Sequence, residues 1–333
     1  MADAVSTSTL FLTGGSGYIG RNLLRAFVAD GFRVRALARS EKAANVVSGL
    51  GAEPVRGDLL DVEALKRGMA GAGLVIHAAA DTDHGMGSTA QAEVNLQGTR
   101  NVYEVAKAQG VQRALHLSTE AVLLDGRPLR NADETTPIPE KHAGGYSKTK
   151  AEAERIALAH SGDGLDVIVV RPRFVWGRDD TTALPQLIEA ARSGKLSWIG
   201  GGHYEMSTTH IANVVHGVRL ALEKGRGGEV YFITDGRPVG FRTFITALLE
   251  AAGVEPPTTG IPRWIVATVV RVGDFLARLT GGRLHGPMSR QEYAVLGVEV
   301  TLDIDKARRE LGYAPIITRE EGLAEIREAT TAR

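Results

Sequence analysis

Leu10–Gly20 reads LFLTGGSGYIG, and this stretch decides the fold of the chain. Leu10–Leu12 is an apolar run, as expected of a strand that is buried on both faces. Glycines 14, 15 and 17 follow it, and an apolar-periodic helix is expected to begin near Tyr18. Glycine permits a tight turn, and its missing Cβ lets a pyrophosphate approach the backbone at the positive end of a helix. The stretch therefore predicts a dinucleotide-binding strand–turn–helix; the alternative interpretation is an ordinary junction of a strand and a helix.

Strands and helices alternate from this motif to about Gly177, after which the apolar periodicity becomes irregular. Strands are expected at Arg33–Ala38, Ala52–Val55, Leu74–Ala80, Ala114–Ser118 and Asp166–Arg171, and helices at Ile19–Ala29, Leu59–Met69, Gln91–Gln109 and from Tyr146. Residues 120–145, rich in glycine and proline, are expected to form a long loop. Beyond Gly177, helices are expected at Thr182–Arg192, Ile211–Leu222, Phe241–Ala252 and Arg263–Leu279, with short strands at Leu196–Ile199 and Val230–Ile233.

This alternation predicts an α/β fold with a Rossmann doubly wound parallel sheet and a smaller C-terminal substrate-binding lobe. Residues 1–177 are expected to form the NAD(P)-binding domain. Residues 178–333 are expected to form mainly the lobe, with some segments returning to the sheet.

The composition excludes several classes of protein. A chain of 333 residues, 43% of them hydrophobic, can bury a large core, and a net charge of zero argues against nucleic acid as a partner. Cysteine is absent, which excludes disulfides and thiolate catalysis, and the nine histidines follow no metal-binding pattern. The N-terminus lacks a signal-peptide pattern, and no apolar run approaches the roughly 20 residues of a membrane span. We therefore expect a cytoplasmic protein with no metal and no integral membrane span.

The end of the second strand bears on cofactor choice. Sites for NAD usually place an acid there to hold the ribose hydroxyls, whereas this chain has Ala38 followed by Arg39. An arginine can pair with a 2′-phosphate, so NADP is favoured over NAD, unless Arg39 is merely a surface residue. Asp58, after the third strand, can accept a hydrogen bond from an adenine amino group or cap the helix at Leu59–Met69.

Four polar side chains have placements that core packing does not explain: Asn95, Thr119, Tyr146 and Lys150. A tyrosine hydroxyl has a pKa of about 10, and a lysine one helical turn away is expected to lower it. The Thr119 hydroxyl, at a strand end, can bond to a substrate oxygen. The spacing Y-x-x-x-K also arises by chance on solvated helices, but here it follows a Rossmann start and a strand that ends in Ser-Thr.

These residues and several further segments resemble the extended short-chain dehydrogenase/reductase family. The matching segments are TGGSGYIG, GDLLD, HAAA, VNLQGTRNV, YSKTK, RPRFVWG, THIANVVHG and DIDKARRELGYAP, together from Leu10 to about Gly322. Within the family, the chain is most similar to the branch of 3β-hydroxysteroid and sterol-4-carboxylate dehydrogenases. The resemblance implies that Tyr146 is the acid/base, that Lys150 binds ribose, that Thr119 orients the substrate oxygen and that Asn95 supports the active-site helix. It also implies a set of cofactor contacts: Gly14, Gly17, Tyr18, Ile19, Gly20, Arg39, Asp58, Leu59, Ala78, Ala79, Tyr146, Lys150, Pro172 and Val175.

The chain departs from the family at a few positions. Thr119 replaces the more usual serine and keeps the hydroxyl. Leu123-Leu124 stand where many sugar-nucleotide epimerases have Tyr-Gly, and Trp176 replaces a tyrosine before Gly177. These departures argue against a nucleotide-sugar substrate. The expected function is NADP-dependent interconversion of an alcohol and a ketone on an apolar or steroid-like small molecule.

Two rival functions remain open on the sequence: a nucleotide-sugar epimerase or dehydratase, and a non-catalytic dinucleotide-binding regulator. The C-terminal half supplies apolar side chains for a hydrophobic substrate, namely Trp198, Met206, Trp264, Ile265, Val269 and Phe275. The amphipathic helix expected at Arg263–Leu279 can pack on the core, join a homodimer, line a substrate mouth or lie on a membrane.

Overall fold

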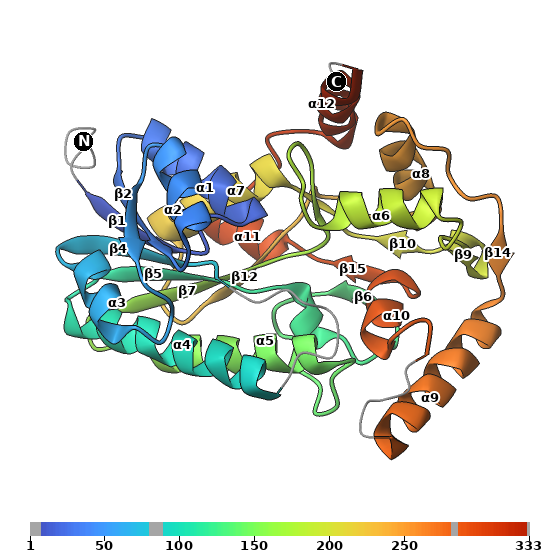
Figure 1. The fold of residues 1–333 in the computed structure, drawn as a ribbon, viewed down its shortest axis with the longest axis horizontal. Helices are drawn as coiled ribbons and strands as arrows, with labels where there is room; N and C mark the ends of the chain where they lie inside the picture. The colour runs from blue at the N-terminus through green and yellow to red at the C-terminus, as the bar shows by residue number, and fades with distance from the viewer. Residues whose placement is uncertain (1–7, 80–88, 281–285, 332–333) are drawn as a thin grey trace.

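A computed structural model describes residues 8–79, 89–280 and 286–331 of the chain. Seven parallel strands form the central sheet, in the order β12-β7-β5-β4-β1-β2-β3 (Figure 1). Their bounds are β1 (Thr9–Thr13), β2 (Arg33–Ala38), β3 (Glu53–Arg56), β4 (Ala72–His77), β5 (Arg113–Leu117), β7 (Asp166–Pro172) and β12 (Val230–Ile233). The chain runs outward from β1 through β2 and β3, then crosses back to β4 on the other side. This confirms the doubly wound sheet, whose crevice lies beyond the carboxyl ends of β1 and β4.

Helices cover both faces of this sheet (Figure 1). On one face lie α1 (Tyr18–Ala29), α2 (Glu41–Gly49) and α7 (Ile211–Lys224), and on the other lie α3 (Val62–Met69), α4 (Thr89–Ala108) and α5 (Gly145–Ala159). The buried run in β1 explains this double cover. Leu10 and Leu12 join the core beneath α1, whereas Phe11 points the opposite way and joins the core beneath α3.

Segments beyond Gly177 return to the Rossmann layers. Strand β12 pairs in parallel with β7, and helix α7 packs against α1.

The lobe contains a second, mixed sheet, with its strands in the order β13-β10-β15-β6. Its strands are β13 (Val239–Gly240), β10 (Glu205–Met206), β15 (Val300–Leu302) and β6 (Leu129–Ala132). The expectation of a plain loop over residues 120–145 was wrong, because this segment contains both β6 and a 3₁₀ turn, η1 (Glu120–Leu123). Strand β6 is short and pairs with β15, far along the chain, so no local pattern could predict it.

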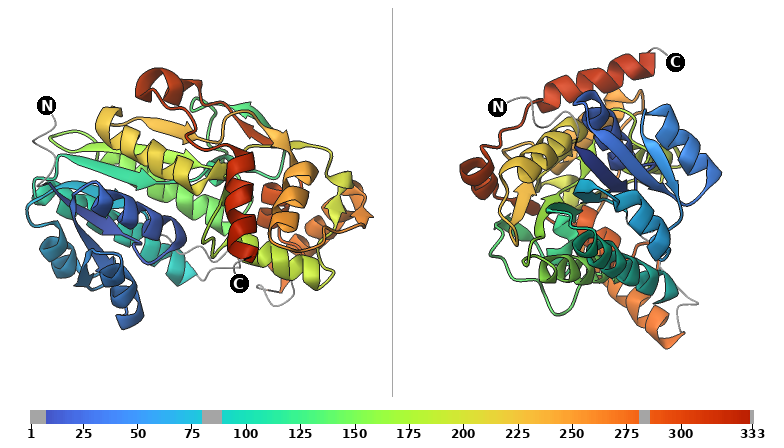
Figure 2. Two further views of the ribbon diagram at one scale, coloured as in Figure 1. Left: turned by 90° about the horizontal axis from the view of Figure 1, so that it is seen from above. Right: turned by 90° about the vertical axis from the view of Figure 1, so that its left-hand side faces the viewer.

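Helices α6 (Ala183–Arg192), α8 (Phe241–Ala251), α9 (Arg263–Leu279), α10 (Arg290–Leu296), α11 (Asp305–Leu311) and α12 (Arg319–Thr331) lie in the C-terminal part of the chain. There are also two separate two-stranded sheets: β8 (Val175–Trp176) pairs with β11 (Thr209–His210), and β9 (Trp198–Ile199) pairs with β14 (Gly260–Ile261). Helix α12 packs against α8 (Figure 2).

The apolar residues expected to meet a substrate lie in two different places. Trp198 and Met206 are fully buried in the core of the lobe. Helix α9 packs its Val266 and Val270 inward, whereas Trp264 and Phe275 are 71% and 62% exposed. Within the described ranges, no helix is both long and apolar enough to span a bilayer.

Candidate active site

The turn between β1 and α1 brings backbone into close contact. Gly14 has a φ of +79°, and a Cβ there would lie 2.7 Å from the Ala79 backbone nitrogen. A Cβ on Gly20 would collide with the Gly14 carbonyl oxygen, and the Gly17 N–H donates to that oxygen at 3.0 Å. Gly17 precedes α1, and no side chain caps this helix start. Tyr18 and Ile19 open the helix, so its first N–H groups face the crevice where a pyrophosphate is expected.

The end of β4 is tied to the end of β1. The Ala78 N–H donates to the Thr13 carbonyl at 3.3 Å, and the Ala79 N–H donates to Thr13 Oγ1 at 3.2 Å. Thr13 Oγ1 lies 2.7 Å from His77 Nδ1, and His77 Nε2 lies 3.1 Å from Thr99 Oγ1. Burial lowers the pKa of His77 to about 3, with the Lys150 charge acting in the same direction, so the imidazole is neutral. His77 is thus a satisfied core residue; Ala80, also expected in this strand, lies outside the described residues.

The ribose end of the crevice lies beyond β2. Ala38 is buried at the end of the strand, and Arg39 follows it with an exposed side chain. Arg35, on the same strand, points elsewhere, since its Nη1 donates to the carbonyls of Gly68 and Ala70 at 3.2 and 2.7 Å.

The suggestion that Asp58 caps a helix at Leu59–Met69 was wrong. Helix α3 begins at Val62, and its cap is Asp61, which accepts a hydrogen bond from the Ala64 N–H at 2.9 Å. Asp58 instead closes the preceding turn, because its Oδ1 accepts from the Leu60 and Asp61 N–H groups. Leu59 packs between this turn and α4, where its carbonyl accepts a hydrogen bond from Asn101.

The three predicted catalytic side chains other than Asn95 meet beside the carboxyl end of β5. Thr119 caps the start of η1, and its Oγ1 accepts a hydrogen bond from the Ala121 N–H at 3.2 Å. Tyr146, in the first turn of α5, is hydrogen-bonded to the Thr119 side chain. Lys150, one turn further, donates from Nζ to the Leu117 carbonyl at 2.8 Å. This arrangement of a strand end, a 3₁₀ turn and a helix start brings together the hydroxyl of Thr119, the phenol of Tyr146 and the ammonium group of Lys150.

Asn95 lies half-buried on α4, which packs along α5. Its carbonyl accepts a hydrogen bond from Thr99 Oγ1 at 2.9 Å, one turn further along the helix. Its predicted support of the active-site helix stays a prediction.

The pKa of Tyr146 differs from the value expected from the sequence. Burial raises the pKa of Tyr146, and the charge of Glu120 raises it further, against a lowering by the hydrogen bond with Thr119. The prediction that Lys150 lowers this pKa was wrong for this structure, because the ammonium group is turned toward the Leu117 carbonyl. Burial also lowers the pKa of Lys150 to about 8, although Glu154 acts in the opposite direction.

Two buried carboxylate–arginine pairs flank these residues, and sequence reasoning missed both. Glu154, one turn after Lys150, accepts hydrogen bonds from Ser118 Oγ at 2.6 Å and from Arg171 Nε at 2.9 Å. Glu120, next to Thr119, lies 3.6 Å from Arg173 Nε. Arg171 lies in β7, and Arg173 lies just beyond the end of this strand. Charged residues inside the apolar run VIVVRPRFVW were the available signal.

Pro172 and Val175 continue this edge of the sheet, where Pro172 ends β7 and Val175 begins β8. Trp176, by contrast, is fully buried in the lobe, and its Nε1 donates to Asp235 Oδ2 at 2.8 Å.

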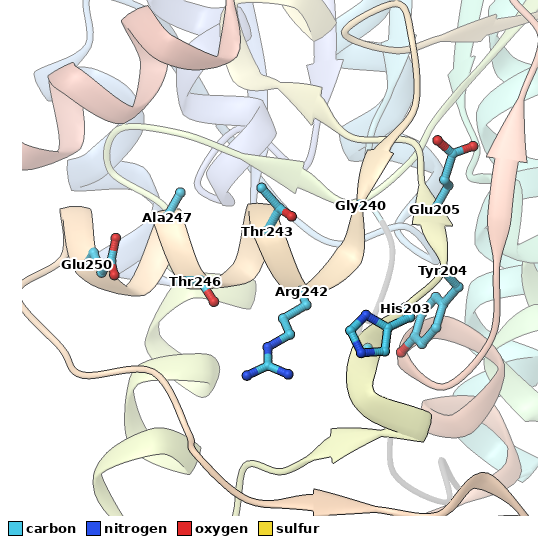
Figure 3. A pocket seen from close by; sticks show the side chains of 10 residues that line it. His203, Tyr204, Glu205, Gly240, Arg242, Thr243, Thr246, Ala247 and Glu250 are labelled. Atoms are coloured by element: carbon cyan, nitrogen blue, oxygen red, sulfur yellow. The ribbon is translucent and has the colours of Figure 1, made fainter.

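A separate pocket of about 710 Å³ opens in the lobe (Figure 3). It lies between α8 and the segment that leads into β10, and Arg242 and His203 are among the residues that line it. Thr119, Tyr146 and Lys150 are not among the residues that line it, so it is distinct from the catalytic cluster.

Comparison with known proteins agrees with this geometry. The model of the 3-beta hydroxysteroid dehydrogenase/isomerase family matches residues 11–263. The chain is 49% identical to a 4-hydroxy-2-methyl-3-oxo-4-farnesyl-3,4-dihydroquinoline-1-oxide ketoreductase of Stigmatella aurantiaca, over 97% of this chain and 96% of the relative. It is 31% identical to a decarboxylating sterol-4-alpha-carboxylate 3-dehydrogenase of Dictyostelium discoideum, over 95% of this chain and 99% of the relative.

The fold also matches solved structures. A dTDP-glucose 4,6-dehydratase of Streptomyces venezuelae with NAD bound gives a TM-score of 0.77 at 25% identity, covering 98% of this chain and 97% of its own. These similarities confirm the predicted fold class and the resemblance to extended short-chain dehydrogenases. They also confirm the expectation of an NAD(P)-dependent enzyme that interconverts an alcohol and a ketone. The chain belongs to the 3-beta hydroxysteroid dehydrogenase/isomerase family.

Proposed function

We propose that this chain is an NADP-dependent reductase or dehydrogenase for a ketone–alcohol pair on an apolar or steroid-like small molecule. The observation that carries the proposal is the meeting of Thr119, Tyr146 and Lys150 at one strand end. The glycine turn between β1 and α1 opens onto the same edge of the sheet.

Each side chain has a distinct task in this proposal. A nicotinamide cofactor, when bound, supplies or accepts the hydride at the carbonyl carbon. Tyr146 gives its hydroxyl proton to the carbonyl oxygen during reduction and takes it back during oxidation. Thr119 donates a hydrogen bond to the same oxygen, while Lys150 holds the ribose hydroxyls and Asn95 supports the helix. A Tyr146 pKa raised by burial keeps the phenol protonated, which suits proton donation to a ketone.

The preference for NADP rests on the end of β2. Ala38 offers no carboxylate to the ribose hydroxyls, and the exposed guanidinium of Arg39 lies next to the same position. Arg35 is held by two backbone carbonyls, so the preference depends on Arg39.

The substrate class is supported by the relatives and by two leucines at the end of η1. The two relatives are named for a farnesylated quinoline oxide and for a sterol carboxylate, both largely apolar molecules. Leu123 and Leu124, where many sugar-nucleotide epimerases have Tyr-Gly, are 5% and 1% exposed and help to form the core. Intact Tyr146 and Lys150 also argue against a non-catalytic regulator. The possible homodimer stays a prediction.

The proposal is tested by NADPH absorbance with a panel of apolar ketones and a matched set of nucleotide sugars. We expect net NADPH consumption with the ketones and none with the sugars. Tyr146→Phe removes the proton donor and little volume, so kcat should fall by about 100-fold or more while NADPH binding persists. Thr119→Val should also lower kcat, and Thr119→Ser much less. Turnover of a nucleotide sugar without net NADPH consumption, or near-normal ketone reduction by Tyr146→Phe, would contradict the proposal.

A further inference from the structure

Helix α5, which carries Tyr146 and Lys150, begins without a cap of its own. Its N-cap residue is Gly144, which has no side chain to accept a hydrogen bond from the first turn. The first N–H groups of a helix have no partner within the helix, and an N-cap side chain usually accepts from the second or third of them. The third residue of α5 is Ser147, directly after Tyr146, and it is fully buried. Its N–H therefore needs an acceptor from elsewhere in the protein.

Gln291, on α10 of the lobe, supplies this acceptor. Its Oε1 accepts hydrogen bonds from the Ser147 N–H at 3.3 Å and from Ser147 Oγ at 2.9 Å. A Cβ on Gly144 would lie 2.9 Å from both Cβ and Oε1 of Gln291. Glycine at the N-cap thus leaves room for a capping side chain that is 144 residues further along the chain than Ser147.

The two donors of Ser147 fix the orientation of the Gln291 amide, with its oxygen toward α5. Gln291 is 5% exposed, and its Nε2 has no hydrogen-bond partner among the described residues. Within this part of the chain, the side chain therefore makes its hydrogen bonds through the oxygen. The oxygen is the atom whose loss should matter.

Tyr146 lies in the turn that this contact closes. Its ring packs against an apolar cluster that includes Ala143 and, from α10, Ala294. One turn further along α5, Lys150 is fixed separately, because its Nζ donates to the Leu117 carbonyl at 2.8 Å. Removal of the cap should therefore loosen the turn that holds the phenol and leave the lysine in place. Proton transfer is sensitive to such a change, since a small misplacement of a reacting group lowers the rate steeply.

We propose that Gln291 is a positioning residue: it caps α5 from the lobe and thereby holds Tyr146 in the orientation for proton transfer. The inference rests on the proposed function. A second contact holds α10 against the segment after η1, because Arg290 Nη2 donates to the Asp125 carbonyl at 2.6 Å. The lobe thus contributes to turnover through α10, and the contact acts on kcat rather than on the affinity for the cofactor.

The test measures kcat for ketone reduction and the Kd of NADPH for full-length variants. Gln291→Ala leaves the Ser147 N–H without its acceptor, so kcat should fall about tenfold or more. The Kd of NADPH should change little, since Lys150 keeps its hydrogen bond to Leu117. Gly144→Ala is a second route to the same loss, because its Cβ displaces the Gln291 oxygen and brings no acceptor. Gln291→Glu keeps the acceptor, so its kcat should stay within about threefold of the wild type.

Rescue by a cap on α5 itself separates positioning from other roles of Gln291. The Gly144 backbone is extended, so a serine fits there, and its hydroxyl can accept from the Ser147 N–H once the glutamine side chain is gone. Gly144→Ser added to Gln291→Ala should restore kcat to within about threefold of the wild type. Gly144→Ala added to Gln291→Ala is the matched control and should restore nothing, because it adds a Cβ without an acceptor.

Thr318→Ala controls for the loss of a helix cap as such. Thr318 Oγ1 accepts from the Glu321 N–H at 3.2 Å at the start of α12, so this variant should lose stability and keep kcat. A wild-type kcat in Gln291→Ala, or in Gly144→Ala should the first variant fail to fold, overturns this inference alone. So does a defect that Gly144→Ser leaves unrepaired, or a loss of kcat in Gln291→Glu. A wild type that reduces no ketone contradicts the proposed function and this inference with it.

Discussion

At the residue scale, burial of ionisable groups shifts the pKa values in this site. Lys150 is 7% exposed, its ammonium group donates to the Leu117 carbonyl, and the charge of Glu154 favours its charged form. Burial disfavours the charged form of a lysine, which explains the lowered pKa. The same side chain is proposed to hold the cofactor ribose. We therefore expect the buried lysine to lower the stability of the protein while it strengthens cofactor binding.

Lys150→Met should make the cofactor-free protein more stable at neutral pH. The pKa of Lys150 is about 8 in the folded chain and 10.5 in an exposed lysine. The unfolded chain therefore binds more protons between these values, and wild-type stability should rise with pH there. At pH 7 the cost of burying the charge is fully present, and its removal should add about 1–2 kcal/mol after the loss of the Leu117 hydrogen bond.

Urea denaturation at pH 7 and pH 10 measures this difference, which should shrink at the higher pH. NADPH binding, measured in parallel, should weaken. A Lys150→Met protein less stable than the wild type at pH 7 would show that the contacts of the ammonium outweigh its burial.

Cofactor preference should depend on Ala38 and Arg39. A guanidinium beside a 2′-phosphate contributes about 1.5–3 kcal/mol, or about a tenfold to hundredfold preference for NADPH. Because Arg39 is exposed, the effect should lie toward the lower end and weaken with salt. Ala38→Asp with Arg39→Asn should reverse the preference, as measured by the Kd of each cofactor. Arg35→Gln serves as the control and should leave the ratio of the two Kd values unchanged, because Arg35 is held by backbone carbonyls at the end of α3. Equal binding of NADH and NADPH by the wild type at low salt would refute this role for Arg39.

At the element scale, the junction of β1 and α1 is the most constrained part of the fold. Helix α1 approaches the strand end so closely that the Gly20 position has no room for a side chain. Four strand predictions came close: β2 and β12 have the predicted bounds, β5 begins and ends one residue earlier than predicted, and β7 is one residue longer than predicted. Strand β6 was missed because its pairing with β15, rather than its own composition, makes it a strand.

Gly20→Ala should destabilise the protein and weaken cofactor binding together. The new methyl group would meet the backbone of Gly14 and Gly15, which cannot move without opening the turn. We expect a loss of about 3 kcal/mol or more, or failure to fold. Gly49→Ala is the control, because a Cβ there meets no atom within 4 Å and alanine favours helix. Thermal denaturation compares the two; equal midpoints would mean that the turn can relax.

At the scale of the whole molecule, Asp235 connects the sheet to the lobe. It follows β12, and its Oδ1 accepts from the His210 N–H and from Asn213 Nδ2 at 2.6 and 2.8 Å. Its Oδ2 accepts from Trp176 Nε1 and Thr208 Oγ1 at 2.8 and 2.7 Å. These donors come from β8, from β11 and the residue before it, and from α7.

Asp235→Ala should therefore destabilise the whole chain rather than one part of it. Four donors would lose their acceptor, and an unsatisfied buried donor costs about 1–3 kcal/mol, so we expect a loss of at least about 3 kcal/mol. Asp163→Asn, at an exposed ion pair with Lys107, is the control and should have little effect. Unfolding followed by tryptophan fluorescence and by circular dichroism should show one shared transition at a lower midpoint. Separate transitions would mean that the lobe unfolds independently of Asp235.

The sequence by itself determined the fold class, the glycine turn and the shared helical face of Tyr146 and Lys150. Each of these depends on neighbours within a few residues, because strand burial, turn geometry and helical spacing are local properties. Only the tertiary structure decided that Trp198 and Met206 belong to the core, that β6 is a strand, and that Glu120 and Arg173 lie beside the catalytic hydroxyls. It also decided the direction of the Tyr146 pKa. These features depend on segments distant in the chain that meet only when the sheet and lobe pack, and burial and charge act through those contacts.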